Sequence, residues 1–340
     1  MFEARPELGG LMRYGIPAYR LSRAVLDGEI ARIVALGIDV HCNQAMDTTA
    51  ALAQLQQDYD AVYLATGAAR QRRLPGLDYD PGWVMDGAAY LAACNADAPP
   101  SLGKRVVVIG GGSAALDAAR SARRAGHAVT LLALEKRAQM PAQAEEVHEA
   151  LEEGIELVDG ARLDRVDASV DGARYIRCTR VDFVAGAMRG QFTLTPVPDS
   201  GFTLIADAII TSIGQDPDLA MLGRHFAVVG SLMQVDARQA TSVPGVYAGG
   251  DVASMARFVT EAVGMGKRAA QAIVRDLGRR HAVTDGATVD ALEDLVPLAA
   301  IATFYHPARA RAQSHLLPAA ERVTRNAEVQ QGLELEQVLA

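Results

Sequence analysis

Residues 103–135 read GKRVVVIGGGSAALDAARSARRAGHAVTLLALE and decide the fold. The run from Lys104 to Ile109 is nearly continuous in β-branched residues, which is typical of a parallel strand buried on both faces. Three glycines interrupt this run, residues 113–125 are typical of a helix, and residues 127–134 are typical of a second strand. This order of strand, turn, helix and strand predicts a dinucleotide-binding Rossmann unit in an α/β protein.

The turn in this stretch has the spacing Gly110-x-Gly112-x-x-Ala115. Gly110 permits a tight turn, Gly112 leaves room for the backbone to approach a pyrophosphate, and Ala115 keeps the helix close to the strand. The helix that starts at Ser113 offers free amide donors and the positive end of its dipole to phosphates. A glycine triplet alone is weak evidence, so the prediction depends on the complete context around it. The alternative is a turn with a structural role only.

The end of the second strand indicates which dinucleotide binds. Glu135 occupies about the position where an acidic side chain accepts both ribose hydroxyls of NADH and repels the 2′-phosphate of NADPH. Lys136 and Arg137 follow directly and could reach such a phosphate, so NADPH stays open as the less favoured cofactor. A solvated strand end without a ligand is the remaining interpretation.

Composition and charge argue against several classes of protein. The 340 residues exceed one ordinary domain, and a net charge of −8 would repel nucleic acid and anionic membrane surfaces. Cys42, Cys94 and Cys178 form no Cys-x-x-Cys pair, which argues against a disulfide reductase and against a disulfide framework. With no signal peptide and no apolar stretch long enough for a bilayer, we expect a cytoplasmic protein that neither inserts into membranes nor binds nucleic acid.

The sequence offers no candidate for proton-transfer or metal chemistry. The seven histidines lack the spacing of zinc ligands, and no Gly-x-Ser-x-Gly elbow occurs. The carboxylate pairs at 145–146 and 152–153 are expected on the solvated face of a surface helix. We therefore predict no catalytic side chain and no metal site.

Outside residues 103–135 the sequence predicts shorter elements. A helix capped by Ser22 and ended by Gly37 should carry an apolar face of Leu26, Ile30, Ile33 and Val34. The other expected elements are strands at 1–3, 38–42, 59–64, 208–213 and 245–248, small antiparallel strands within 160–210, a proline-containing crossover from about 75 to 100, and a helix at about 260–277.

Several blocks together resemble the glutamate synthase small-subunit family. They are residues 5–17 (RPELGGLMRYGIP), 65–67 (ATG), 110–112 (GGG), 140–142 (MPA), 213–215 (IGQ) and 246–251 (VYAGGD), in the order of the family. The resemblance covers about residues 1–280 and implies a flavoprotein with two interleaved Rossmann-like domains. It implies an FAD-binding domain at 1–101 and 214–281, an inserted NAD(P)H-binding domain at 102–213, and a C-terminal extension at 282–340.

The resemblance also implies residues that hold FAD. Glu3 matches the acidic residue that binds the adenosine ribose, and Asp251 matches the one that binds the ribityl or pyrophosphate region. The helix that begins near Thr260 would point its N-terminus at the flavin, where its dipole favours the anionic reduced ring. A turn aspartate that satisfies its own backbone is the alternative for Asp251. The further cofactor-binding residues implied are Gly10, Arg13, Thr66, Gly67 and Gly250.

Three departures from the family refine these expectations. A strand and a Gly-x-Gly-x-x-Gly loop are expected roughly 20–30 residues before Glu3. The chain is therefore a fragment, obtains that element from another chain, or no longer holds FAD tightly. Leu134 and Glu135 stand where NADPH-specific relatives carry paired arginines, which favours NADH. Because cysteines for an iron–sulfur cluster are missing, electrons should leave to a partner.

The sequence as a whole predicts an FAD-dependent NAD(P)H:acceptor oxidoreductase. Hydride would pass from NADH to FAD, and electrons would pass on to an electron-accepting subunit or an iron–sulfur protein. The alternative is a flavin-free NAD(H)-binding module or accessory subunit.

Overall fold

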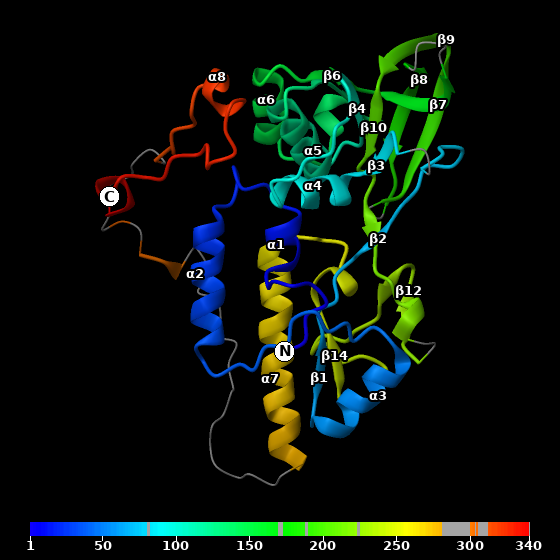
Figure 1. Cartoon of the computed structure of the whole chain (residues 1–340). Helices are drawn as coiled ribbons and strands as arrows, with labels where there is room; N and C mark the ends of the chain where they lie inside the picture. The colour runs from blue at the N-terminus through cyan, green and yellow to red at the C-terminus, as the bar shows by residue number, and fades with distance from the viewer. Residues whose placement is uncertain are drawn as a thin grey trace. The chain divides into compact units, whose positions relative to one another are not determined.

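The computed structural model describes residues 1–79, 82–168, 173–187, 190–222, 225–280, 300–302, 304 and 312–339. The chain divides into two compact units, whose elements are labelled in Figure 1. Unit 1 comprises Met1–Ala45, Gln71–Gly214 and Ser314–Glu334, and unit 2 comprises Met46–Arg70, Gln215–Gln313 and Leu335–Ala340. The predicted extension at 282–340 lies partly outside the described residues.

A five-stranded parallel sheet forms the centre of unit 1. Its order is β3 (Val84–Asp86), β10 (Ala208–Thr211), β4 (Arg105–Ile109), β5 (Ala128–Leu132) and β6 (Glu156–Val158). The two strands predicted around the glycine turn are β4 and β5, which pair directly with each other. This arrangement confirms the predicted Rossmann unit and the α/β class.

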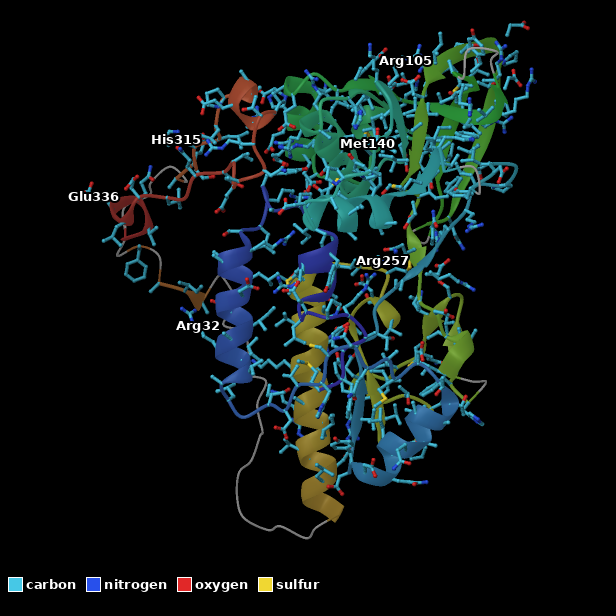
Figure 2. All side chains as sticks on the ribbon, in the orientation of Figure 1. Arg32, Arg105, Met140, Arg257, His315 and Glu336 are labelled. Atoms are coloured by element: carbon cyan, nitrogen blue, oxygen red, sulfur yellow. The ribbon has the colours of Figure 1, made fainter. Side chains whose placement is uncertain are left out.

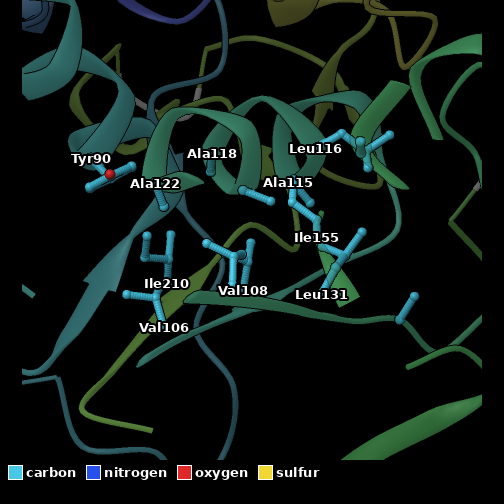
Figure 3. Close-up of a cluster of buried hydrophobic side chains, with 14 of the residues drawn as sticks. Tyr90, Val106, Val108, Ala115, Leu116, Ala118, Ala122, Leu131, Ile155 and Ile210 are labelled. Atoms are coloured by element: carbon cyan, nitrogen blue, oxygen red, sulfur yellow. The ribbon is translucent and has the colours of Figure 1, made fainter. Parts of the chain in front are cut away.

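Three helices cover one face of this sheet: α4 (Gly87–Asn95), α5 (Ser113–Arg124) and α6 (Ala144–Glu152). Val106 and Val108 of β4 belong to the cluster on this face, together with Ala115 and Ala118 of α5 (Figure 3). Both alanines are fully buried. Their small side chains let α5 approach the sheet closely, as the third position of the glycine motif requires.

A three-stranded antiparallel sheet packs on the other face. It consists of β7 (Ala161–Ala168), β8 (Arg174–Ala185) and β9 (Phe192–Ala206). Val107 and Ile109 of β4 are buried in the same cluster as Ile176 of β8. The β-branched run of β4 is therefore buried on both faces, as predicted. The antiparallel strands predicted within 160–210 are also present, and they are longer than expected.

The remaining elements of unit 1 are α1 (Gly10–Tyr14), α2 (Arg23–Val34), the 3-10 helix η1 (Arg137–Gln139) and α8 (Ala319–Arg322). Ser22 is the N-cap of α2, but among the described residues its side chain forms no capping hydrogen bond. Of the predicted apolar face, Leu26 is buried, whereas Ile33 is 54% exposed. The strands predicted at 1–3 and 38–42 are wrong, because these segments form only an isolated bridge between Phe2 and His41.

The segment predicted as a proline-containing crossover contains regular structure. Residues 84–86 form β3, which pairs with β10, and Asp86 caps α4 by accepting the amide of Ala89 over 3.1 Å. Pro81 lies outside the described residues. Part of this segment therefore belongs to the parallel sheet of unit 1. The assignment of residues 1–101 and 214–281 to an FAD domain stays a prediction.

Of the carboxylates predicted on a solvated face of α6, Glu145 and Glu152 are exposed as expected, whereas Glu153, which follows the helix, is buried. The side chain of Glu153 is 0% exposed and accepts hydrogen bonds from Arg120 over 2.6 and 3.1 Å. It also accepts bonds from Arg124 over 2.7 and 3.1 Å. The two arginines are four residues apart on α5 and so share one face of that helix. The prediction for Glu153 is wrong because a neighbouring helix supplies the compensating charges.

Unit 2 is built around a parallel pair of strands. β1 (Val62–Leu64) pairs with β14 (Val246–Ala248), and Tyr247 packs against Ala269 and Ala272 of α7 (Val259–Arg280). The other elements are α3 (Thr49–Asp58), β11 (Gln215–Asp216), η2 (Ala220–Leu222), β12 (Val228–Val229), β13 (Leu232–Met233), η3 (Gly250–Val252) and α9 (Leu335–Leu339), and β2 (Arg70–Gln71) spans the boundary between the units. The predicted strand at 245–248 and the helix at 260–277 are confirmed.

Candidate functional site

The predicted glycine turn joins the end of β4 to the start of α5. Gly110 has φ +145°, a conformation that favours glycine, and a Cβ at this residue would collide with the backbone oxygen of Ser212. Its amide donates to the backbone oxygen of Leu132 over 2.9 Å, which holds the turn against β5. The protein therefore requires glycine at position 110 whatever ligand the turn binds.

Gly112 is the N-cap of α5 and has space around it. Its φ of −92° is accessible to other residues, and a Cβ there would meet one described atom within 4 Å, the Cγ of Pro141 at 4.0 Å. The amides of Ser113 and Ala114, at the very start of α5, have no partners within the helix, and the helix dipole adds positive potential. The next two amides, of Ala115 and Leu116, donate to the backbone oxygen of Gly112. An open, positive turn of this kind fits a pyrophosphate.

Ala115 supplies the close contact between helix and strand. It is fully buried, and its Cβ lies 3.1 Å from the position that a Cβ on Gly110 would occupy. A larger side chain at 115 would push α5 away from the turn, so Ala115 serves the packing of the motif.

Glu135 follows β5 by three residues, and its carboxylate lies over the glycine turn. Its Oε2 is 2.5 Å from the position that a Cβ on Gly111 would occupy, so Gly111 provides the space for the carboxylate. Burial raises the pKa of Glu135, and a hydrogen bond from its own backbone amide opposes that shift. The structure thus brings together the acidic residue and the turn that the sequence predicted as one site.

The two cationic residues after Glu135 contact Asp159. The Nζ of Lys136 lies 3.9 Å from Asp159 Oδ1, and the backbone amide of Arg137 donates to Asp159 Oδ2 over 2.9 Å. The side chain of Lys136 also packs against Gly160 at the end of β6. The ammonium group of Lys136 is therefore partly neutralised by a carboxylate of the protein.

Residues 140–142 form a second wall of the turn. The amide of Ala142 donates to the backbone oxygen of Gly111 over 3.3 Å, and Pro141 Cδ lies 3.5 Å from the position of a Cβ on Gly111. Met140 is buried and packs on the cluster beneath the helices (Figure 2). In the sequence this segment is visible only as one of the blocks that resemble the family.

Unit 2 gathers a second group of predicted cofactor residues at one edge of its parallel pair. Thr66 and Gly67 follow β1, whereas Gly250 and Asp251 follow β14. Because β1 and β14 are parallel and in register, the segments after them begin at the same edge. The carboxyl ends of parallel strands are where ligands bind in open α/β sheets.

The N-terminus of α7 lies at this edge. A Cβ on Gly250, which has φ +72°, would lie 3.6 Å from the Cβ of Ala262 in the first turn of α7, and Thr260 belongs to the same turn. Burial raises the pKa of the Asp251 carboxyl, and the positive charge of Arg257 opposes this shift. The edge thus combines a carboxylate with helix amides, a donor set that fits hydroxyl and phosphate groups.

Tyr63 of β1 is a residue of this edge that the sequence did not single out. A Cβ on Gly249 would collide with the Tyr63 hydroxyl. Burial raises the pKa of Tyr63, and the positive charge of Arg268 opposes the shift. Gly249 is therefore needed for packing against an aromatic strand residue, a requirement that no local pattern in the sequence indicates.

The predicted residues Glu3, Gly10 and Arg13 belong to unit 1. Glu3 Oε1 accepts the amide of Arg5 over 2.8 Å, and Gly10 begins α1 with φ +49° and space around it. Arg13 pairs with Asp27, whose hydrogen bond raises the pKa of the guanidinium. Their roles toward FAD stay predictions.

Comparisons with known proteins agree with this geometry. The chain is 38% identical to the NADP(+)-dependent formate dehydrogenase subunit beta of Moorella thermoacetica, over 98% of this chain and 48% of that protein. It is 29% identical to the glutamate synthase [NADPH] small chain of Escherichia coli strain K12, over 81% of this chain and 62% of that protein. The chain thus spans about half to three fifths of the length of these relatives.

A solved structure shares the fold. FprA from Mycobacterium tuberculosis, as its His57Gln mutant, superposes with a TM-score of 0.68 at 16% identity, over 83% of this chain and 78% of that chain. In the part of the chain that the structure describes, no helix is both long and apolar enough to cross a membrane.

The family of the chain follows from its direct match to a family model. A family model described as pyridine nucleotide-disulphide oxidoreductase matches residues 26–266, which is more than half of the chain. The match confirms the predicted oxidoreductase class, and the glutamate synthase relative confirms the predicted resemblance. The chain therefore belongs to the pyridine nucleotide-disulphide oxidoreductase family.

Proposed function

We propose that this chain is the FAD- and NAD(P)H-binding part of an electron-transferring oxidoreductase. The observation that carries the proposal is the open glycine turn. Gly112 leaves space in front of the amides of α5, and the carboxylate of Glu135 lies over the same turn. A pyrophosphate on the helix and a ribose on the carboxylate would occupy these two positions at once.

The residues of the chain bind and orient the cofactors. The amides at Gly112 and Ser113 would hold the pyrophosphate of the nucleotide, and Glu135 would accept its ribose hydroxyls. Asp251 and the first turn of α7 would hold FAD in unit 2. When bound, FAD supplies a ring that accepts hydride and passes electrons on singly or in pairs.

NADH is proposed as the preferred nucleotide. The partly buried carboxylate of Glu135 would repel a 2′-phosphate, and Lys136 is engaged by Asp159. The names of both relatives above contain NADP(+) or NADPH, which makes NADPH the competing cofactor. The proposed preference for NADH over NADPH therefore depends on two side chains: the carboxylate of Glu135 at the glycine turn and the ammonium group of Lys136 near Asp159.

Calorimetric titration of the purified chain with NADH and with NADPH tests this specificity. We expect NADH to bind about tenfold more tightly, because one charge repulsion or lost charged hydrogen bond amounts to roughly 1.4 kcal/mol. Glu135→Ala should weaken NADH and strengthen NADPH. Glu145→Ala, an exposed carboxylate on α6, is the matched control and should change neither. Tighter binding of NADPH by the wild type would refute the preference for NADH.

Absorbance of the purified chain with added FAD tests the flavin part of the proposal. A bound-flavin spectrum that bleaches with NADH would support a working reductase. A colourless chain that ignores FAD and still binds NADH would instead support the flavin-free module. The electron acceptor is proposed to be a partner subunit or an iron–sulfur protein, since both relatives are named as a subunit or chain of an enzyme.

A further inference from the structure

An arginine from the N-terminal segment connects the two walls of the glycine turn. Arg20 donates through Nη1 to both carboxylate oxygens of Asp117, each over 2.9 Å. Its Nη2 lies 2.5 Å from Glu146 Oε1. The side chains of Asp117 and Glu146 are 8% and 12% exposed and that of Arg20 is 33% exposed, so both contacts are partly shielded from water. One guanidinium thus joins α5 to α6.

The contact with Asp117 fixes the helix that opens at the turn. Asp117 is the fifth residue of α5, one turn after Ser113. Because Nη1 contacts both carboxylate oxygens of a largely buried aspartate, the charge-assisted pair restricts movement of α5 near its N-terminus. The amides proposed to hold the pyrophosphate are therefore fixed relative to Arg20.

The contact with Glu146 fixes the opposite wall. The second oxygen of Glu146, Oε2, accepts the amide of Gln143 over 3.2 Å in a capping box at the start of α6. Gln143 directly follows Ala142, whose amide donates to Gly111. Arg20 is therefore connected, through Glu146 and then Gln143, to Ala142 in the loop that faces the turn.

From these contacts we infer that Arg20 is a positioning residue for the pyridine nucleotide. It sets the spacing between the first turn of α5 and the 140–142 loop, and so the fit of the pyrophosphate between them. The inference rests on the proposed function, because it assumes that the turn binds a nucleotide. Arg20 acts through Asp117 and Glu146 and need not touch the ligand itself.

Binding of ADP-ribose and of NADH to Arg20→Gln tests the inference. ADP-ribose carries the pyrophosphate and the adenosine ribose and lacks nicotinamide, so it reports on the turn and Glu135 without the nicotinamide. We expect both ligands to bind about tenfold more weakly, the equivalent of one charge-assisted hydrogen bond. In flavin reduction by NADH, KM should rise while kcat stays near the wild-type value. Arg20→Lys keeps the charge without the planar fork and should restore part of the affinity.

Arg105→Gln is the matched control. Arg105 pairs with Asp207 over 2.7 Å at the start of β4, the opposite end of that strand from the turn (Figure 2). This variant removes an arginine ion pair from the same unit and should leave both affinities unchanged. A purely structural role of Arg20 would lower the thermal midpoint and leave the affinities of the folded protein as they were.

The outcomes separate this inference from the proposed function. If the wild type binds neither ligand, the proposed function fails. If the wild type binds and Arg20→Gln binds with the same affinities, only the role of Arg20 is refuted. If the Arg20→Gln variant fails to fold, the Glu146→Gln variant tests the inference in its place. It keeps the size of the side chain, removes the charge that holds Arg20, and is expected to weaken ADP-ribose several-fold. Wild-type affinity in that variant would overturn the inference.

Discussion

In the turn between β4 and α5, each of the three adjacent glycines is explained by a different physical cause. Gly110 is required by its backbone conformation and by the nearby Ser212, whereas Gly111 makes space for Glu135. Gly112 has an ordinary φ and open space, so the folded chain alone does not require it. The sequence motif assigns Gly110 to the tight turn and Gly112 to the pyrophosphate and gives Gly111 no role, and the structure supplies the reason for Gly111.

This distinction predicts opposite behaviour for two alanine variants. Gly112→Ala should unfold at nearly the wild-type temperature and lose NADH binding, because its methyl group would occupy the space proposed for the pyrophosphate. Gly110→Ala should be destabilised by about 3 kcal/mol through backbone strain and overpacking. Thermal unfolding and NADH titration of both variants provide the measurement. Wild-type affinity in Gly112→Ala would argue against a pyrophosphate at this turn.

The buried carboxylate of Glu153 gives a prediction about stability and pH. Burial alone would raise its pKa, but hydrogen bonds from Arg120 and Arg124 hold the pKa below the ordinary value of 4.5. Glu153→Gln should lower the free energy of unfolding at pH 7 by about 3–5 kcal/mol, because buried arginines lose their counter-charge.

The pH dependence of this effect follows from linkage. A lowered pKa stabilises the fold above the ordinary pKa, and that contribution is lost as the pH falls through the lowered value. The difference between wild type and Glu153→Gln should therefore shrink below about pH 4.5. Urea unfolding at several pH values measures it. Glu29→Gln, in an exposed pair with Arg32, should cost less than about 1 kcal/mol at every pH. A pH-independent difference for Glu153→Gln would contradict the account.

At the scale of helices and strands, the sequence predicted an element correctly where the hydrophobic pattern of its residues matches their burial in the fold. The β-branched run of β4 lies between two layers, so its composition alone identifies it as a buried strand. By contrast, α4 was not predicted, because its alanine-rich sequence lies in a segment with several prolines. The burial of Glu153 depends on arginines of another helix, and no local periodicity contains that information.

The C-terminal segment of unit 1 shows the same dependence on distant partners. Arg322 of α8 is 2% exposed, and its Nη2 lies 2.5 Å from Glu152 Oε2. Val329, further along the segment, is buried, and its amide donates to the backbone oxygen of Tyr19 over 3.1 Å. The resemblance implied only a C-terminal extension for this part of the chain, and its described part is docked on unit 1 through the buried Arg322.

Arg322→Ala should therefore release this segment from the unit. Loss of the buried arginine leaves the carboxylates of α6 without one of their counter-charges, so residues 314–334 should exchange amide hydrogens and be cleaved by protease faster. Hydrogen exchange followed by mass spectrometry locates the change. Arg325→Ala, an exposed arginine 4.0 Å from Glu321, is the control and should leave protection unchanged. Equal protection in both variants would show that Arg322 does not dock the segment.

At the scale of the whole molecule, the sequence predicted the family, and the division into an FAD domain and an inserted NAD(P)H domain stays a prediction. The glycine motif and Glu135 were predicted as one site, and the structure places them together. The contact of Arg20 with Asp117 could not be predicted, because it joins residues 97 positions apart in the sequence. Residues 140–142 were noted only as a block that resembles the family, and their contact with Gly111 came from the structure. The NADH preference and the FAD contacts remain proposals that binding experiments decide.

The most direct test of the account is anaerobic mixing of the FAD-loaded chain with NADH, followed through the absorbance of the flavin. The account predicts that the flavin of the wild type bleaches, whereas the flavin of Gly112→Ala stays oxidised although that variant is folded. Bleaching of Gly112→Ala at the wild-type rate, or a wild type that binds both cofactors without bleaching, would contradict it.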